Sequence, residues 1–171
     1  MKTKFITLIT TIIAMFFTTI LLGFASKNKI SIDGVWYFVE VQVVKSNGTY
    51  TSTYPKESLA IFFDNYYSFC WTSHVSTDHN WQLADSVKVN RFNQSIINTG
   101  SFELKDSILT TKAIFAMSPK FTSGLAKFKC YFVGDTLIIK GLRVVSSDNL
   151  SHPIYASGSY VINKLLKVRS K

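Results

Sequence analysis

The sequence offers few residues whose type and spacing would support catalysis, and Glu40 is the first of them. Trp36, Phe38 and Glu40 are spaced two apart, so strand parity predicts that their side chains share one face. A carboxylate inside an apolar fold would pair with a cation such as Arg143, or have a raised pKa and serve as a hydrogen-bond anchor or base. The alternative is that the strand reaches the rim at Glu40 and the carboxylate stays in water.

A small histidine cluster is the second candidate. His74, Asp78 and His79 lie close together, but a metal site needs three or four converging ligands, and no Cys or Glu stands near them. We expect surface histidines and no metal. The sequence has no Gly-x-Ser-x-Gly elbow, no supported Cys-His pair and no phosphate-binding glycine loop. It therefore predicts no catalytic residues and no cofactor.

The chain has a positive net charge, but most of its lysines and arginines are spread along the sequence. The chain has 19 Lys and Arg against 10 Asp and Glu, a net charge of +9. Most lysines alternate with apolar residues along strand-like runs, so we expect no nucleic-acid partner. The cations gather only near the end of the chain, where we expect a solvated terminus; the alternative is a weak contact for acidic lipids or polyanions. These residues are Lys164, Lys167, Arg169 and Lys171.

The first residues have the pattern of an export signal. Lys2 and Lys4 precede an uncharged apolar run over 5–22, and Gly23 and Ala25 occupy the positions that a signal peptidase prefers. We expect residues 1–25 to be a signal peptide and 30–168 to form one secreted or periplasmic domain. Because the apolar run is long, an uncleaved membrane anchor is the alternative.

The remainder predicts an all-β fold. Runs of β-branched and aromatic residues alternate with turn signals, and no long stretch has a helical apolar period. Eight strands joined mainly by tight hairpins indicate an antiparallel up-and-down meander that closes into a barrel. The segment 75–98 is long for a loop and has apolar residues of its own, which indicates a packed lid or a short helix. The expected strands are 34–44, 59–63, 66–74, 99–104, 108–116, 125–133, 136–145 and 157–166.

Alternation within the strands predicts which side chains face inward. Phe128, Cys130 and Phe132 alternate with lysines, and the Gly134-Asp135 hairpin carries that face to Leu137, Ile139 and Gly141. Leu109 and Phe115 belong to the inward face of the preceding strand. Around the Asp64-Asn65 hairpin both faces are apolar, and the segment 75–98 is expected to cover one of them. Cys70 and Cys130 are either buried small side chains or, in an oxidising compartment, a disulfide.

Five short motifs follow one another along the chain: Gly34-Val35-Trp36, Asn47-Gly48, Tyr54-Pro55, Gly100-Ser101-Phe102 and Gly134-Asp135-Thr136-Leu137. This ordered set resembles the bacterial lipocalin-like domain family. The resemblance implies an eight-stranded calycin-type barrel with Gly34 and Trp36 as structural residues. In lipocalins a Lys or Arg covers the first-strand tryptophan, and Arg143, Lys164 and Arg169 are all possible matches here.

An eight-stranded barrel is just wide enough to hold one small ligand or to be filled by its own side chains. We expect a small hydrophobic or amphipathic ligand in the interior, with membrane contact only through an uncleaved leader. The alternatives are a packed scaffold that binds other proteins through its loops, and a calycin-type isomerase or cyclase using Glu40 or a tyrosine. The expected ligand-binding residues are Phe38, Glu40, Phe102, Phe115, Phe128, Phe132, Leu137 and Ile139.

Overall fold

The structure is a computed structural model that describes residues 30–75, 77 and 80–169. The expected signal peptide, Asp78 and His79 lie outside these residues. Among the described residues, no helix has the length and apolar character needed to cross a membrane.

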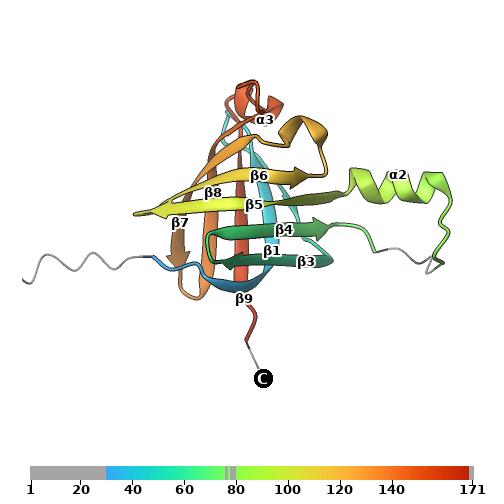
Figure 1. The fold of residues 1–171 in the computed structure, drawn as a ribbon, viewed down its shortest axis with the longest axis horizontal. Coiled ribbons are helices and arrows are strands. Elements are labelled where there is room, and N and C mark those ends of the chain that lie inside the picture. Colours follow the sequence, from blue (N-terminus) through green and yellow to red (C-terminus); the bar gives the residue numbers. More distant parts are fainter. Residues whose placement is uncertain (1–29, 76, 78–79, 170–171) are drawn as a thin grey trace, which may run out of the picture.

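The described chain forms a closed antiparallel β-barrel (Figure 1). Each strand pairs with the next along most of the chain, and β1 pairs with β9 to close the barrel. β2 and β3 lie along the same edge of β1, against residues 41–44 and 34–36, so together they fill one of eight positions. The expected eight-stranded up-and-down barrel is confirmed. The strands are β1 (Gly34–Val44), β2 (Tyr50–Thr53), β3 (Glu57–Phe63), β4 (Tyr66–Thr72), β5 (Ser95–Lys105), β6 (Ile108–Ala116), β7 (Leu125–Val133), β8 (Thr136–Val145) and β9 (Tyr160–Lys167).

The connections divide the barrel into two ends. Tight hairpins join β3 to β4, β5 to β6 and β7 to β8, and each contains residues with positive φ, as Asp64, Asn65, Asp106 and Gly134 show. The start of β1 and the end of β9 lie at the same end, which we call the hairpin end. The other end carries the helices α2 (Asp85–Asn93), η1 (Pro119–Phe121) and α3 (Pro153–Ala156), and we call it the helix end.

Helix α2 supplies the short helix expected in the segment 75–98. It projects beside the barrel (Figure 1), and none of its residues is buried. An ion pair of 2.7 Å joins Arg91 Nη2 of the helix to Glu57 Oε2 at the start of β3. The expectation that this segment covers an apolar face of the Asp64-Asn65 hairpin is wrong, because Phe63 and Tyr66 stay exposed.

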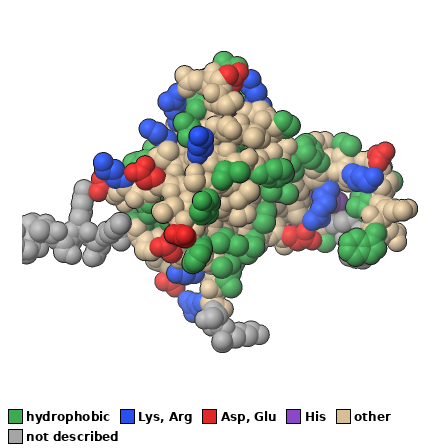
Figure 2. Space-filling view, viewed as in Figure 1, with side chains coloured by type: hydrophobic (Ala, Val, Ile, Leu, Met, Phe, Trp, Pro, Cys, Tyr) green, Lys and Arg blue, Asp and Glu red, His purple; other side chains and the backbone are tan. Residues whose placement is uncertain are grey.

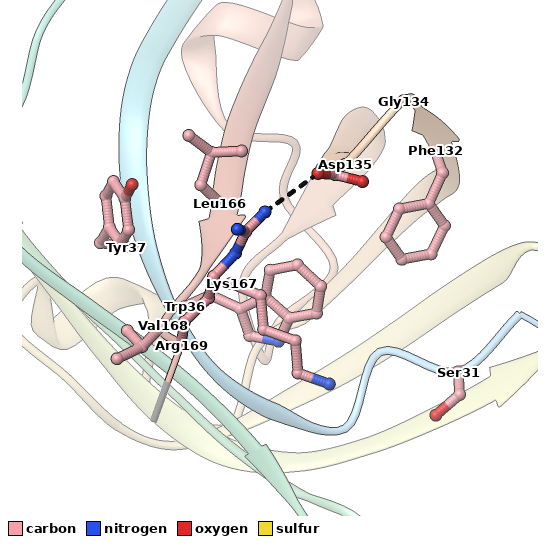
Figure 3. A pocket seen from close by; sticks show the side chains of 10 residues that line it. All are labelled: Ser31, Trp36, Tyr37, Phe132, Gly134, Asp135, Leu166, Lys167, Val168 and Arg169. Carbon is pink, nitrogen blue, oxygen red and sulfur yellow. Dashed lines mark hydrogen bonds and ion pairs between the residues drawn. The ribbon is translucent and has the colours of Figure 1, made fainter. Parts of the chain in front are cut away.

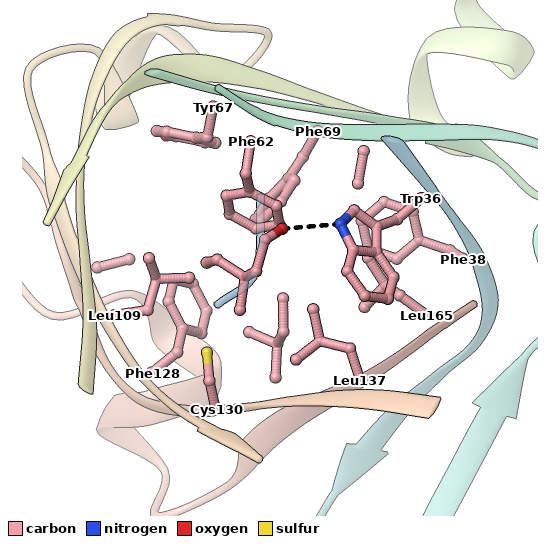
Figure 4. Close-up of a cluster of buried hydrophobic side chains, with 14 of the residues drawn as sticks. Trp36, Phe38, Phe62, Tyr67, Phe69, Leu109, Phe128, Cys130, Leu137 and Leu165 are labelled. Carbon is pink, nitrogen blue, oxygen red and sulfur yellow. Dashed lines mark hydrogen bonds between the residues drawn. The ribbon is translucent and has the colours of Figure 1, made fainter. Parts of the chain in front are cut away.

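Aromatic side chains pack against one another in the barrel interior (Figure 4). Phe38, Phe62, Tyr67, Phe69 and Phe102 pack edge to face, with ring centroids 5.1 to 5.6 Å apart. The rest of the interior is packed with fully or almost fully buried side chains that continue this cluster. They include Leu109, Phe128, Cys130, Leu137, Ile139 and Leu165.

A β-bulge moves Phe115 to the outside of the barrel. Gly100 on β5 pairs with Ala113 and the neighbouring Thr99 pairs with Phe115, so Ile114 is an extra residue on β6. An extra residue reverses the alternation beyond it. Phe115 is 55% exposed and Ala116 is buried. The expectation that Phe115 faces inward is therefore wrong.

The two cysteines lie on opposite faces of the barrel wall. Cys130 is buried in the interior, where desolvation raises the pKa of its thiol to about 12. Cys70 on β4 pairs in register with Leu59 and Ile97, whose side chains are exposed on the outer surface. Both thiols are free, so the disulfide alternative is wrong and the buried-residue interpretation holds for Cys130.

Candidate ligand-binding site

A hollow of about 920 Å³ lies at the hairpin end of the barrel (Figure 3). It is bounded by the start of β1, the β7–β8 hairpin and the residues at the end of β9. The pairing of β9 with β1 continues beyond the end of β9, because the Val168 N–H donates to the carbonyl oxygen of Val35 at 2.9 Å. The lining residues are Ser31, Trp36, Tyr37, Phe132, Gly134, Asp135, Leu166, Lys167, Val168 and Arg169.

Trp36 forms the boundary between the hollow and the packed interior. Its side chain is 2% exposed, and its indole Nε1 donates to the carbonyl oxygen of Ile32 at 2.8 Å. The ring of Phe132 lies 6.1 Å from the Trp36 ring, centroid to centroid. Ile32 is itself 1% exposed, so the residues preceding β1 close the barrel beneath the indole.

Lys167 covers the tryptophan. Its Nζ lies 5.4 Å from the centroid of the Trp36 ring, which is within the range of a cation–π contact. The lysine stem passes over Gly34, where an added Cβ would lie 2.8 Å from Lys167 Cε. The first-strand glycine thus leaves room for the cation. Arg143, Lys164 and Arg169 were the expected matches for this role, and none of them fills it.

The hollow combines apolar walls with positive charge. Phe132 is 42% exposed there, and Tyr37 and Leu166 add further apolar surface. Arg169 makes an exposed ion pair of 3.2 Å with Asp135, whereas no carboxylate in the described part of the chain pairs with Lys167. The two cations and one carboxylate leave a net charge of +1 in this site. Such a site suits a molecule with an apolar body and an anionic group.

The structure separates the expected ligand-binding residues into three groups. Phe132 lines the hollow. Glu40 and Phe115 face away from the interior. The remaining five, which are packed in or against the core cluster, are Phe38, Phe102, Phe128, Leu137 and Ile139.

Several lining residues were missed by the sequence analysis. Lys167 and Arg169 were assigned to a solvated terminus, although Lys167 is the last residue of β9 and pairs directly with Trp36 on β1. Tyr37 and Leu166 are directly paired across β1 and β9. Their pairing depends on which strand closes the barrel, so only the cation cluster itself was a usable signal.

Glu40 lies on the outer side of the wall because of a second bulge. Phe38 pairs with Leu165 and Glu40 with Lys164, which leaves Val39 as the extra residue on β1. The prediction that Glu40 shares the face of Trp36 and Phe38 is wrong for this reason. The expected partner Arg143 instead donates to Asn149 Oδ1 at 2.7 Å.

The Glu40 carboxylate joins three strands. It lies 2.7 Å from Lys164 Nζ on β9, and it accepts hydrogen bonds from Ser52 Oγ on β2 at 2.6 Å and Gln42 Nε2 at 2.8 Å. Its side chain is 16% exposed, so it is not a freely solvated group at the rim. The hydrogen bonds from Lys164 and Ser52 hold the pKa of Glu40 below its usual value. These contacts assign Glu40 a structural role.

The lowered pKa of Glu40 predicts a pH-dependent contribution to stability. Because the folded chain holds the carboxylate ionised, the contribution is present above the unfolded pKa of about 4.5 and is lost as pH falls through the lower folded value. We expect Glu40→Gln to lower the free energy of unfolding by about 1 kcal/mol at pH 7. The difference from wild type should shrink at pH 3, as measured by urea denaturation. The exposed Glu103→Gln is the control, and an equal response of both variants would contradict the role of Glu40.

At the helix end, a tyrosine occupies the interior side of the wall. Gly141 pairs with the inward-facing Phe128, and a Cβ on Gly141 would overlap the hydroxyl of Tyr155 from α3. Burial raises the pKa of Tyr155 to about 12. The Tyr155 ring thus narrows this end of the barrel, whereas the hairpin end carries the open hollow.

No family model, no curated protein and no solved structure matches the chain. The closed eight-stranded antiparallel barrel is consistent with a calycin-like fold. In the described ranges, no group of three or more His, Cys, Asp or Glu side chains is placed to hold a metal ion.

Proposed function

We propose that this chain is an exported lipocalin-like barrel that binds one small amphipathic molecule with an anionic group, in the hollow at the hairpin end. The observation that carries the proposal is the combination of the exposed apolar ring of Phe132, beside Trp36, with the cation of Lys167, which no carboxylate among the described residues pairs with. Export rests on the leader pattern of Lys2, the apolar run and Ala25.

The packing of the interior supports placing the ligand at the end of the barrel. The aromatic cluster around Phe62 and Phe69 occupies space that a ligand deep in the barrel would need. In the hollow, an apolar body would cover the exposed part of Phe132, which is 42% exposed, and each 100 Å² removed from water contributes about 2.5 kcal/mol. The anionic group would lie near Lys167 Nζ, where the contact is charge-assisted.

The position of Glu40 argues against the enzyme alternative in the form that uses this residue. An isomerase or cyclase would need the carboxylate beside its substrate, whereas Glu40 is held on the outer wall by Lys164 and Ser52. The binding proposal needs neither an acid nor a base.

Two related dyes test the proposal. 1-Anilinonaphthalene-8-sulfonate and N-phenyl-1-naphthylamine have the same ring system, and only the first carries a sulfonate. We expect the anionic dye to bind at one site per chain, and Lys167→Gln to weaken it about tenfold, which corresponds to about 1.4 kcal/mol. Binding of the neutral dye should change little in this variant, as measured by fluorescence titration.

Matched variants separate the hollow from other apolar surfaces. Lys129→Gln is the control for Lys167→Gln, because it makes the same charge change on the outer wall of β7. Phe115→Ser is the control for Phe132→Ser, because it removes an exposed ring that lies far from the hollow. We expect only Lys167→Gln and Phe132→Ser to weaken the anionic dye. If the two outer-wall variants weakened it equally, the hollow would not be the binding site.

A further inference from the structure

The outer surface of β3, β4, β5 and β6 carries a group of neighbouring uncharged side chains, most of them apolar. We call it the outer apolar face. Paired residues form rows across the strands: one row contains Leu59, Cys70 and Ile97, and the next contains Ile61, Ser68, Thr99 and Phe115. Phe63 and Tyr66 complete it at the hairpin. Figure 2 shows this side of the barrel, with hydrophobic side chains over its middle and most charged groups toward the borders. Its apolar members are Leu59, Ile61, Phe63, Tyr66, Cys70, Ile97 and Phe115.

The face differs from the lysine-bearing part of the outer surface of β7. The outer surface of an antiparallel sheet is ordinarily polar when it meets water. On β7 the outward positions include Lys127 and Lys129, in accord with this rule. On the outer apolar face, Phe63 is 74%, Tyr66 59% and Phe115 55% exposed. Helix α2 leaves these side chains uncovered.

From these observations we infer that the outer apolar face binds a second copy of this chain. The chain has a net charge of +9, or +7 without Lys2 and Lys4 of the expected leader, so two copies repel each other least where they meet through a surface without cations. The middle of this face is such a surface, because Lys112, next to Ser101 in the row of Tyr66, and the Glu57–Arg91 pair stand at its borders. A two-fold contact would place the lysines of β7 away from the partner.

The size of the face fits a dimer. Three large aromatic rings at half to three-quarters exposure, with Leu59 and Ile97 beside them, offer apolar surface on the order of 500 Å². A stable interface buries roughly 800 Å² on each partner, with a polar rim around an apolar centre. Ser68, Thr99 and Ser101 supply polar atoms among the rings.

A lipid surface fits the face less well. Membrane-binding faces combine apolar side chains with lysine and arginine that meet anionic head groups. At the borders of the outer apolar face the cations are Lys112 and Arg91, and Arg91 is already ion-paired with Glu57 at 2.7 Å. We therefore assign the face to a second copy, and lipid binding is an outcome of the test.

The expected result is a dimer in solution. Sedimentation equilibrium of the mature chain up to about 100 µM should give twice the monomer mass, and Phe63→Lys or Phe115→Lys should raise the dissociation constant at least about tenfold. Leu142→Lys is the matched control, because Leu142 is 48% exposed on β8 outside this face. Circular dichroism should show that all three variants stay folded, since each residue replaced is exposed.

Cys70 provides an independent readout within the face. The chain has two cysteines, and Cys130 is fully buried. A short bismaleimide should therefore join two copies through Cys70, and both Cys70→Ser and Phe63→Lys should abolish the product. A monomer at every concentration would overturn the inference. Binding of the monomer to anionic phosphatidylglycerol vesicles that is lost in Phe63→Lys would also overturn it and assign the face to lipid.

Discussion

Trp36→Ala should lower the free energy of unfolding by about 3–5 kcal/mol, which is a large share of the stability of a domain of this size. The indole is 2% exposed and closes the hairpin end of the barrel. Its removal would leave a cavity, an unpaired carbonyl at Ile32, and a lysine at position 167 without the ring that it covers. Urea denaturation followed by circular dichroism measures the change.

Two further tryptophan variants make this result specific. Trp81→Ala deletes the same side chain at a position that is fully exposed, so its effect should stay within about 0.5 kcal/mol. Trp36→Phe keeps an aromatic ring and loses the hydrogen bond to Ile32, and we expect an intermediate effect. A denaturation midpoint that Trp36→Ala leaves unchanged would show that the indole does not hold this end of the barrel.

The strands were predictable because their signals are local. β1, β6, β7 and β8 begin and end where alternation and turn residues placed them, since Asp106 and Gly134 have the positive φ that their hairpins require. β2 was missed because its four residues, Tyr50–Thr53, are polar and lie mostly toward solvent. A run so short and polar has no apolar alternation to reveal it.

Alternation predicted which side chains face inward only as far as the β-bulge in each strand. Parity placed Phe128, Leu137 and Ile139 correctly inside, but it failed for Glu40 and Phe115. Both lie just beyond an extra residue, Val39 in one strand and Ile114 in the other. A bulge is defined by the partner strand, so alternation within a single strand cannot reveal it.

The position of the hollow could not be predicted from the sequence, for a related reason. Phe132, Tyr37 and Lys167 come from three strands, and they meet only because β9 closes the barrel against β1. The sequence indicated a barrel able to hold a ligand, whereas the location of open space depends on how far the aromatic rings fill the interior. That filling follows from packing between strands distant in sequence.

The bulge on β6 leads to the second large expected effect, at Gly100. This residue pairs with Ala113 where Ile114 is inserted, and the backbone of β6 approaches it closely. A Cβ on Gly100 would overlap the carbonyl oxygen of Lys112 and would lie 2.8 Å from the amide nitrogen of Ile114. These are backbone atoms of a paired strand, so they cannot move away as the end of a flexible side chain could.

We therefore expect Gly100→Ala to destabilise the barrel by about 3 kcal/mol, through the distortion of the β5–β6 ladder. Gly48→Ala is the comparison, because a Cβ there meets no atom within 4 Å and only the positive φ of 83° opposes it, at about 1 kcal/mol. Thermal unfolding of both variants measures the difference. If Gly100→Ala were no more destabilising than Gly48→Ala, the two strands would not approach closely at the bulge. The outward position of Phe115 would then need another cause, because that position depends on the same inserted residue.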